Sequence, residues 1–237
     1  QYQSQGLSRR DLHDNPLVQF EQWMSAVVEL ETSDPTAMIL ATVEASQPVQ
    51  RIVLLKEVDD TGFVFFTNRL SAKGRQMAIN NAVSLHFPWH VVTRQVIIKG
   101  HVEQRTRVED VAYFQSRPKA SQWGARASNQ SEPLASRQQL VDRYENEKSL
   151  YPDNIPTPDH WGGYRVIPSV IEFWEGGEDR LHNRFVYTGQ DASGADAASV
   201  QNKNWSIPAP YTHLRAHETK ANPVRRLLPV KIKTSLP

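Results

Sequence analysis

Hydrophobic residues recur at two different spacings along the chain, and the change in spacing predicts its elements. Over residues 16–31 apolar positions recur every three or four residues, which predicts an amphipathic helix that begins near Asn15-Pro16 and stops before Pro35. Shorter apolar runs bounded by turn residues predict strands over 37–44, 49–58, 63–67, 82–87 and 94–104. A hairpin turn is expected at 45–48, and a short helix over 71–80.

The second half of the chain continues this mixture of elements. Helical spacing returns over 107–116 and 137–148, and strands are expected at 163–167, 170–174 and 184–187. Residues 189–201 are rich in Ala, Ser, Asp and Gly and predict a flexible loop. Short strands joined by tight turns favour an antiparallel sheet or barrel over alternating strands and helices. We therefore expect a mainly β fold with flanking helices.

Composition excludes several classes of protein. Of the 237 residues, 39% are hydrophobic and 22% charged, which suits a globular protein with a core. No apolar run approaches the roughly 18 residues of a membrane span. Without cysteine there are no disulfides, thiolate metal sites or cysteine nucleophiles, and the eight histidines show no metal-ligand spacing. We expect a cytoplasmic protein, with organelle import left open because the sequence does not begin with Met.

The formal net charge of +1 hides an uneven distribution. Residues 208–237 hold six of the 27 Lys and Arg residues but only one of the 26 acids, so residues 1–207 carry a net charge of −4. A nucleic-acid-binding function would therefore rest on the tail alone. We expect residues 1–207 to form one domain and 208–237 to be a basic tail with five prolines, foreign to the fold through a splice or reading-frame change. The alternative is a lineage-specific extension.

Two segments in the first half could bind phosphate. Arg51 and Lys56 bracket four aliphatic residues, and strand alternation places the two cations on opposite faces. Each could meet a phosphate, or the segment could be an ordinary core strand with solvated ends. Residues 67–73 lead from a strand into a helix, with Lys73 in its first turn. Free N–H groups and this cation suit an anion, although Ser71 could equally be an ordinary N-cap.

Tyr113, Arg117 and Ser121 recur at a spacing of four residues. One continuous helix would align them on one face. Pro118 favours a break after Arg117, so that Ser121 lies at the start of a second helix. Such a group suits a second phosphate, and a solvated polar helix surface is the alternative.

The densest signal is an aromatic strand that ends at Gly176-Gly177 and is followed by Arg180, His182 and Arg184. On a strand these three side chains would share one face. Three potential cations repel one another unless an anionic or electron-rich group faces them. We therefore expect part of a pocket here, with a solvated edge strand as the alternative.

Taken together, these segments resemble the pyridoxamine 5′-phosphate oxidase family. The likeness runs from about Tyr2 to Ile207 and depends on many ordered matches rather than on any single one. The motifs that carry it lie at 8–12, 34–38, 51–56, 87–89, 94–96, 113–118, 161–165 and 172–184. The resemblance implies an FMN-binding split β-barrel that works as a homodimer, with FMN at the subunit interface.

The resemblance also assigns roles to residues at matching positions. The expected FMN-binding residues are Arg51, Ile52, Val53, Leu54, Phe66, Thr67, Lys73, Gln95, Gln130, Ser131, Trp174 and Arg184. The expected substrate-binding residues are Tyr2, Lys56, Tyr113, Arg117, Ser121, Arg180, Leu181 and His182. Among these, Arg180 and His182 are the catalytic candidates, expected to position the pyridine ring and handle protons.

The implied reaction is the oxidation of pyridoxamine or pyridoxine 5′-phosphate by dioxygen, giving pyridoxal 5′-phosphate and hydrogen peroxide. No side chain here accepts two electrons, so a flavin must carry the redox chemistry. Substrate and FMN each carry a phosphate, which matches two cation clusters. Two rivals remain: a split-barrel protein that binds flavin or haem without this activity, and a nucleic-acid-binding module driven by the tail. We expect no metal, membrane or nucleic-acid partner.

Two positions depart from the family pattern within the expected FMN site. Phe66 stands where the family usually has an aromatic hydroxyl, and Ala72 stands where it usually has a second cation beside Lys73. A lost charge-assisted phosphate contact is worth roughly 1.5–3 kcal/mol. Weakened FMN affinity is therefore expected.

Overall fold

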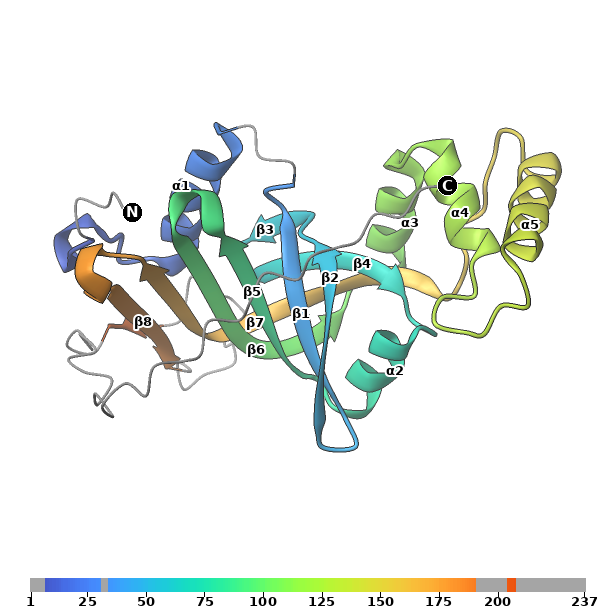
Figure 1. Cartoon of the computed structure of the whole chain (residues 1–237). Coiled ribbons are helices and arrows are strands. Elements are labelled where there is room, and N and C mark those ends of the chain that lie inside the picture. Colours follow the sequence, from blue (N-terminus) through green and yellow to red (C-terminus); the bar gives the residue numbers. More distant parts are fainter. Residues whose placement is uncertain (1–6, 31–33, 191–203, 208–237) are drawn as a thin grey trace, which may run out of the picture.

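A computed structural model describes residues 7–30, 34–190 and 204–207 and shows an antiparallel sheet with helices around it (Figure 1). From one edge to the other, the sheet consists of β2 (Gln47–Leu54), β1 (Ala37–Glu44), β5 (Ala82–Trp89), β6 (Arg94–Gln104), β7 (Trp161–Glu175), β4 (Gly62–Asn68) and β3 (Glu57–Asp59). Strands β8 (Asn183–Gln190) and β9 (Asn204–Ser206) continue from β7. Strand β7 pairs with β4 along its first half and with β8 along its second half. The expected mainly β fold with flanking helices is confirmed.

Helix α1 (Pro16–Val28) covers the core face of the sheet. Asn15 caps it by accepting a hydrogen bond from the Leu17 N–H at 2.9 Å, and Pro16 occupies the first turn. Phe20 is fully buried, and its ring centroid lies 4.9 Å from those of Phe63 and Phe87. Burial of one such ring contributes about 1.5–3 kcal/mol. This face of the sheet and α1 therefore form the main hydrophobic core.

The first strands follow the prediction closely. Strand β1 (Ala37–Glu44) and strand β2 (Gln47–Leu54) form a hairpin whose turn uses left-handed Ala45 and Ser46, with φ of 45° and 69°. The predicted strand over 49–58 is divided, because β3 (Glu57–Asp59) pairs with β4 instead of β1. Exposure alternates along β2. Lys56 lies beyond the end of β2, so the prediction that it and Arg51 point to opposite sides stays a prediction.

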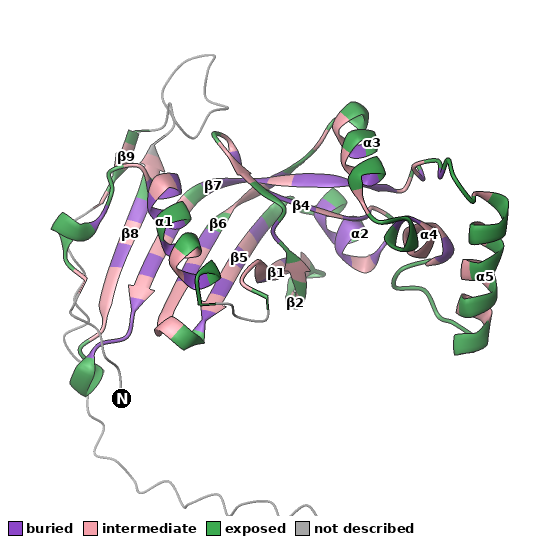
Figure 2. Ribbon diagram, turned by 90° about the horizontal axis from the view of Figure 1, so that it is seen from above, coloured by how far each residue is buried: buried purple, intermediate pink, exposed green. Residues whose placement is uncertain are grey.

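The middle of the chain also matches the predicted elements, and burial alternates along its strands (Figure 2). The structure has β4 (Gly62–Asn68), α2 (Ala72–Ile79), β5 (Ala82–Trp89), the short 3-10 turn η2 (His90–Val92) and β6 (Arg94–Gln104). One face of β5 and β6 is buried against α1, whereas the other is only half-buried. This second face, which includes Gln95, remains available for contact.

Strand β7 (Trp161–Glu175) is one long strand where two were predicted over 163–167 and 170–174. Pro168, which lies between the two predicted strands, is at a register shift opposite Gly100. An added Cβ on Gly100 would lie 2.0 Å from the Ile167 carbonyl oxygen, so only glycine allows this approach. The bulge lets the strand pass Pro168 without ending. It continues into the pairing with β8 (Asn183–Gln190), which pairs in turn with β9 (Asn204–Ser206).

Three helices cluster beyond the start of β7 (Figure 1). They are α3 (Arg107–Ser116), α4 (Lys119–Ala127) and α5 (Arg137–Leu150). Phe114, Ile155 and Trp161 form a second, smaller core beneath them. The helix break predicted at Pro118 is confirmed, since Pro118 is the N-cap of α4. The remaining short element is the turn η1 (Arg9–Asp11) before α1.

The alternation predicted for Arg180, His182 and Arg184 is wrong. Strand β8 begins at Asn183, and the preceding residues form the 3-10 turn η3 (Glu178–Arg180). Asp179 and Arg180 have left-handed φ values of 52° and 64°, which interrupt strand geometry after the Gly-Gly turn. Arg180 and His182 therefore lie on a loop, and only Arg184 lies on a strand.

Three sequence predictions fall outside the described residues. They concern Tyr2, most of the loop predicted over 189–201, and the tail at 208–237. Within the described part of the chain, no helix is both long enough and apolar enough to cross a membrane.

Candidate functional site

A cavity of about 430 Å³ gathers most of the predicted site residues from the first two-thirds of the chain. Its walls come from β2, the end of β4, the start of α2, and the junction of α3 with α4. The predicted residues that line it are Ile52, Val53, Leu54, Lys56, Phe66, Thr67, Lys73, Tyr113, Arg117, Ser121 and Gln130. Predicted positions up to 78 residues apart in sequence, Ile52 and Gln130, thus meet in one cavity.

One group of polar residues lies where β4 leads into α2; we call Arg51, Thr67 and Lys73 the Lys73 group. Ser71 caps α2, and Lys73 is only 7% exposed. The Lys73 Nζ lies 3.3 Å from Thr67 Oγ1 and 3.4 Å from Ser71 Oγ. No carboxylate of the described residues pairs with Lys73. A buried cation with only neutral neighbours favours an incoming anion.

The pKa of Lys73 also reflects a buried positive charge without a carboxylate partner in the described part of the chain. Burial lowers this pKa below its usual value, and the nearby positive charge of Arg51 lowers it further. Arg51 lies outside the residues lining the cavity, held by Gln76 Oε1 at 2.7 Å and the Leu40 carbonyl at 3.3 Å. These acceptors are neutral, so the positive charge of Arg51 still reaches Lys73. An anion bound at Lys73 would relieve this repulsion.

A second group lies at the junction of α3 and α4; we call Lys56, Tyr113, Arg117 and Ser121 the Arg117 group. The Arg117 guanidinium lies over the Trp161 ring, with 4.8 Å from Cζ to the ring centroid. Its Nη1 is buried without a hydrogen-bond partner among the described residues. Burial lowers the pKa of Arg117. A buried donor without a partner is expected to bind a hydrogen-bond acceptor on a ligand.

Aromatic rings form one wall of the cavity. Phe66 stacks on Tyr113 with ring centroids 3.9 Å apart, and on Trp161 with centroids 5.2 Å apart. Phe66 therefore supplies a flat apolar surface but no hydroxyl. Sequence analysis missed Trp161 as a site residue. Its place at the start of a strand, directly before two glycines, could have indicated a residue that faces a cavity.

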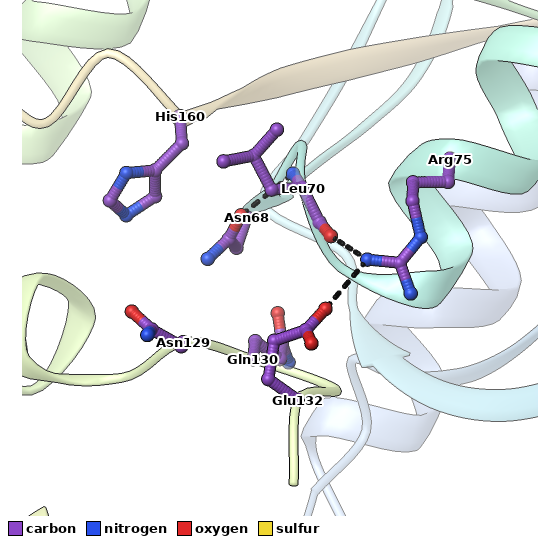
Figure 3. Close-up of a pocket in the computed structure, with 7 residues that line it drawn as sticks. All are labelled: Asn68, Leu70, Arg75, Asn129, Gln130, Glu132 and His160. Atoms are coloured by element: carbon purple, nitrogen blue, oxygen red, sulfur yellow. Dashed lines mark hydrogen bonds and ion pairs between the residues drawn. The ribbon is translucent and has the colours of Figure 1, made fainter.

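The loop that carries Gln130 borders a neighbouring pocket, where contacts with α2 hold it in place (Figure 3). In Figure 3 the Arg75 side chain reaches from α2 toward the Leu70 carbonyl and Glu132, with 3.0 Å between Arg75 Nη1 and Glu132 Oε1. Thr67 Oγ1 lies 3.3 Å from Gln130 Oε1. These contacts connect Gln130 to the Lys73 group. Ser131, with a left-handed φ of 71°, is exposed beside it and outside the residues lining the large cavity.

The remaining predicted residues lie at the other end of the sheet. We call Gln95, Trp174, Arg180, Leu181, His182 and Arg184 the Arg180 group. Trp174 pairs in register with Gln95 on one side and Arg184 on the other, and its ring centroid lies 4.7 Å from that of His182. Arg184 Nη2 lies 2.7 Å from Glu172 Oε2. Trp174 follows Trp161 by thirteen positions of β7, which corresponds to about 43 Å along the strand.

Within one chain, then, the predicted site is divided into two parts. The large cavity holds the Arg117 group and most of the Lys73 group, while the Arg180 group lies on the half-exposed face near the end of β7. No group of acidic and histidine side chains suited to a metal ion occurs in the described ranges.

Comparisons with known proteins define first the fold and then the family. PhzG from Burkholderia lata 383 has the same fold, with a TM-score of 0.77 at 24% identity over 88% of this chain and 98% of that one. An FMN-binding protein related to pyridoxamine 5′-phosphate oxidase from Nostoc punctiforme follows, with a TM-score of 0.64 at 15% identity over 81% and 97%. The expected split-barrel class is confirmed.

Sequence comparison is more specific. A family model described as pyridoxamine 5′-phosphate oxidase matches residues 24–151, and one described as the pyridoxine 5′-phosphate oxidase C-terminal dimerisation region matches residues 161–208. The pyridoxine/pyridoxamine 5′-phosphate oxidase of Shewanella baltica is 53% identical over 81% of this chain and 92% of its own length. The same enzyme of Vibrio cholerae is 52% identical over 78% and 89%. This chain belongs to the pyridoxamine 5′-phosphate oxidase family.

Proposed function

We propose that this protein oxidises pyridoxamine 5′-phosphate or pyridoxine 5′-phosphate to pyridoxal 5′-phosphate, with FMN as coenzyme and dioxygen as final electron acceptor. The observation that carries the proposal is a single cavity lined by cations from different elements; two of them, Lys73 and Arg117, pair with no carboxylate of the described residues. Coenzyme and substrate each bring one phosphate. The match of the chain to the oxidase family supports the same conclusion.

The residues present fit FMN. Lys73 is buried, cationic and surrounded by neutral hydroxyls, which suits the FMN phosphate. We assign Arg51, Thr67 and Gln130 to the same end of the coenzyme, and the segment 52–54 of β2 to its apolar body. When bound, FMN supplies the two-electron chemistry that no side chain offers.

The Arg117 group would hold the substrate phosphate. The unpartnered Nη1 of Arg117 donates to a phosphate oxygen, and Lys56 and Ser121 line the same cavity. The Trp161 ring keeps the guanidinium plane in place by a cation–π contact. The phosphate thus anchors the substrate, and the pyridine ring extends into the cavity.

The Arg180 group completes the site from a second copy of the chain. Arg180 and His182 follow Trp174, which lies about 43 Å from Trp161 along β7, so we assign them to the cavity of the partner and not to that of their own chain. Residues 161–208, which include every member of this group except Gln95, match the dimerisation region of the family. In the proposed dimer, Arg180 and His182 of one copy cover the pyridine ring held by the other.

The overall reaction balances for both substrates. The alcohol of pyridoxine 5′-phosphate loses two hydrogens, and dioxygen gains them as hydrogen peroxide. The amine of pyridoxamine 5′-phosphate is oxidised in the same way, and water then replaces nitrogen, releasing ammonia. The residues of this chain need only bind and orient the coenzyme and the substrate and move protons.

The direct test measures three quantities on purified protein loaded with FMN. They are the flavin spectrum, peroxide release, and the absorbance of pyridoxal 5′-phosphate formed from each substrate. Peroxide and aldehyde in equal amounts would support the proposal. A yellow protein that binds FMN but forms no aldehyde from either substrate would contradict it and favour a split-barrel flavin protein of different activity.

A further inference from the structure

One buried carboxylate lies at the junction of three elements around the cavity. Asp110 of α3 is fully buried. Its Oδ2 accepts a hydrogen bond from Arg69 Nη2 at 2.7 Å, and its Oδ1 accepts one from the Gly163 N–H at 2.7 Å. Both oxygens are therefore used, one in an ion pair and one on the backbone of β7.

Each of the three elements leads to a part of the proposed site. Arg69 lies between Thr67 and Lys73, in the link from β4 to α2. Helix α3 carries Tyr113 one turn after Asp110 and ends at Arg117. Gly163 follows Trp161 on β7. The Arg69–Asp110 pair therefore connects the Lys73 group to the Arg117 group without itself lining the cavity.

Close packing holds this pair in one arrangement. A Cβ added to Gly162 would lie 2.4 Å from Arg69 Cζ and 2.5 Å from Asp110 Oδ2, so glycine is required beneath the pair. The Arg69 N–H also donates to the His160 carbonyl at 2.6 Å. These contacts hold both side chains against β7, so we expect a change in the pair to move α3 relative to the link into α2.

We propose that Asp110 and Arg69 are positioning residues that set the spacing between the two phosphate-binding groups. This inference rests on the proposed function. Neither residue touches the cavity, so both act through Arg117 and Lys73. A buried ion pair costs desolvation and is often no more stabilising than two apolar side chains. Its directional bonds do fix geometry, and small errors in the placement of a substrate lower reaction rates strongly.

The first test is Asp110→Asn, which keeps an oxygen for the Gly163 N–H but removes the negative charge beside Arg69. We expect the KM for pyridoxamine 5′-phosphate to rise at least about tenfold. The Kd for FMN, measured on apoprotein by quenching of flavin fluorescence, should change less than about twofold, because the Lys73 group stays with the sheet. General damage to the fold would weaken both.

Asp59→Asn is the matched control. Asp59 pairs with Arg165 of β7 and joins β3 to that strand, but it belongs to neither phosphate-binding group. We expect the Tm of the Asp59→Asn variant to fall, while its KM for pyridoxamine 5′-phosphate and its Kd for FMN stay at the values of the unchanged protein. If Asp110→Asn lowers only the Tm, as this control does, the positioning role is refuted.

A double-mutant cycle tests whether the two residues act as one unit. Arg69→Met, Asp110→Leu and the double variant are compared for KM at a temperature well below every Tm. If the pair sets the spacing, the double variant raises KM by less than the product of the two single effects. Multiplicative effects would overturn the proposal. Failure of the unchanged protein to oxidise either substrate would instead contradict the proposed function, so the two failures are distinguishable.

Discussion

Trp161 and Trp174 lie at opposite ends of strand β7, and each belongs to a different part of the proposed site. The Trp161 ring supports Arg117 at 4.8 Å, whereas the Trp174 ring lies 4.7 Å from His182. The strand keeps the two parts about 43 Å apart along its length. A single chain thus presents two half-sites, and a pair of chains can bring unlike halves together.

Replacing Lys73 should weaken coenzyme binding without harming the fold. Lys73→Met removes a buried charge that has no carboxylate partner in the described residues, so the Tm of the apoprotein should stay the same or rise. The lost charge-assisted contact is worth about 1.5–3 kcal/mol, or roughly a 10- to 150-fold higher Kd for FMN. Fluorescence titration measures it, with exposed Lys99→Met as control. An unchanged Kd would remove Lys73 from the coenzyme site.

The charge missing at position 72 can be restored. Ala72 occupies the first helical position of α2, directly before Lys73. An arginine there would add a cation near the helix N-terminus, so Ala72→Arg should lower the Kd for FMN several-fold. The same fluorescence titration applies. If the Kd does not fall, the phosphate lies elsewhere or position 72 does not face it.

Arg117 should matter only for phosphorylated substrate. Arg117→Met should raise the KM for pyridoxamine 5′-phosphate by about 10- to 100-fold through loss of a charge-assisted hydrogen bond. The Kd for FMN should hardly change. Unphosphorylated pyridoxamine serves as the control, since its slow turnover should be equal in both proteins. A comparable loss with pyridoxamine would mean that Arg117 acts on the ring or the fold.

Coenzyme binding should begin to weaken at a lower alkaline pH than it would if Lys73 had the pKa of an ordinary lysine. Burial and Arg51 lower the pKa of Lys73 from 10.5, so Lys73 loses its charge below that pH. Between the lowered pKa and 10.5 the unfolded chain binds more protons than the folded apoprotein, so this group makes apoprotein stability rise with pH. Lys73→Arg keeps its charge, and the alkaline rise in Kd should disappear. Persistence of that rise would assign it to another group.

Much of the fold could be predicted because local patterns determine it. Strand β6 and helix α3 were predicted with the observed bounds, and Pro118 correctly indicated the break before α4. The errors occur where long-range contacts override local signals. Pro168 is tolerated inside β7 by a bulge against Gly100, and left-handed Asp179 and Arg180 interrupt the alternation expected before β8.

Sequence patterns indicated several of the residues that line the cavity, but not how these residues are arranged in space. The cavity confirms that Lys56, Lys73 and Arg117 converge, although they come from separate elements. Spacing cannot show that Trp161 supports Arg117, or that Arg69 reaches Asp110 across 41 positions of sequence. Such contacts depend on how the sheet folds. The roles assigned to all of the site residues, with Ser131, Arg184 and Tyr2 among them, stay predictions.

The central claim is that each catalytic site combines the cavity of one chain with the Arg180 group of another. Arg117→Met and Arg180→Met should each be nearly inactive alone at low substrate concentration. Co-expressed in equal amounts, they should form mixed dimers with one intact site, giving about a quarter of the unchanged protein's activity per total dimer. Activity of the mixture no greater than the mean of the two variants would contradict the claim.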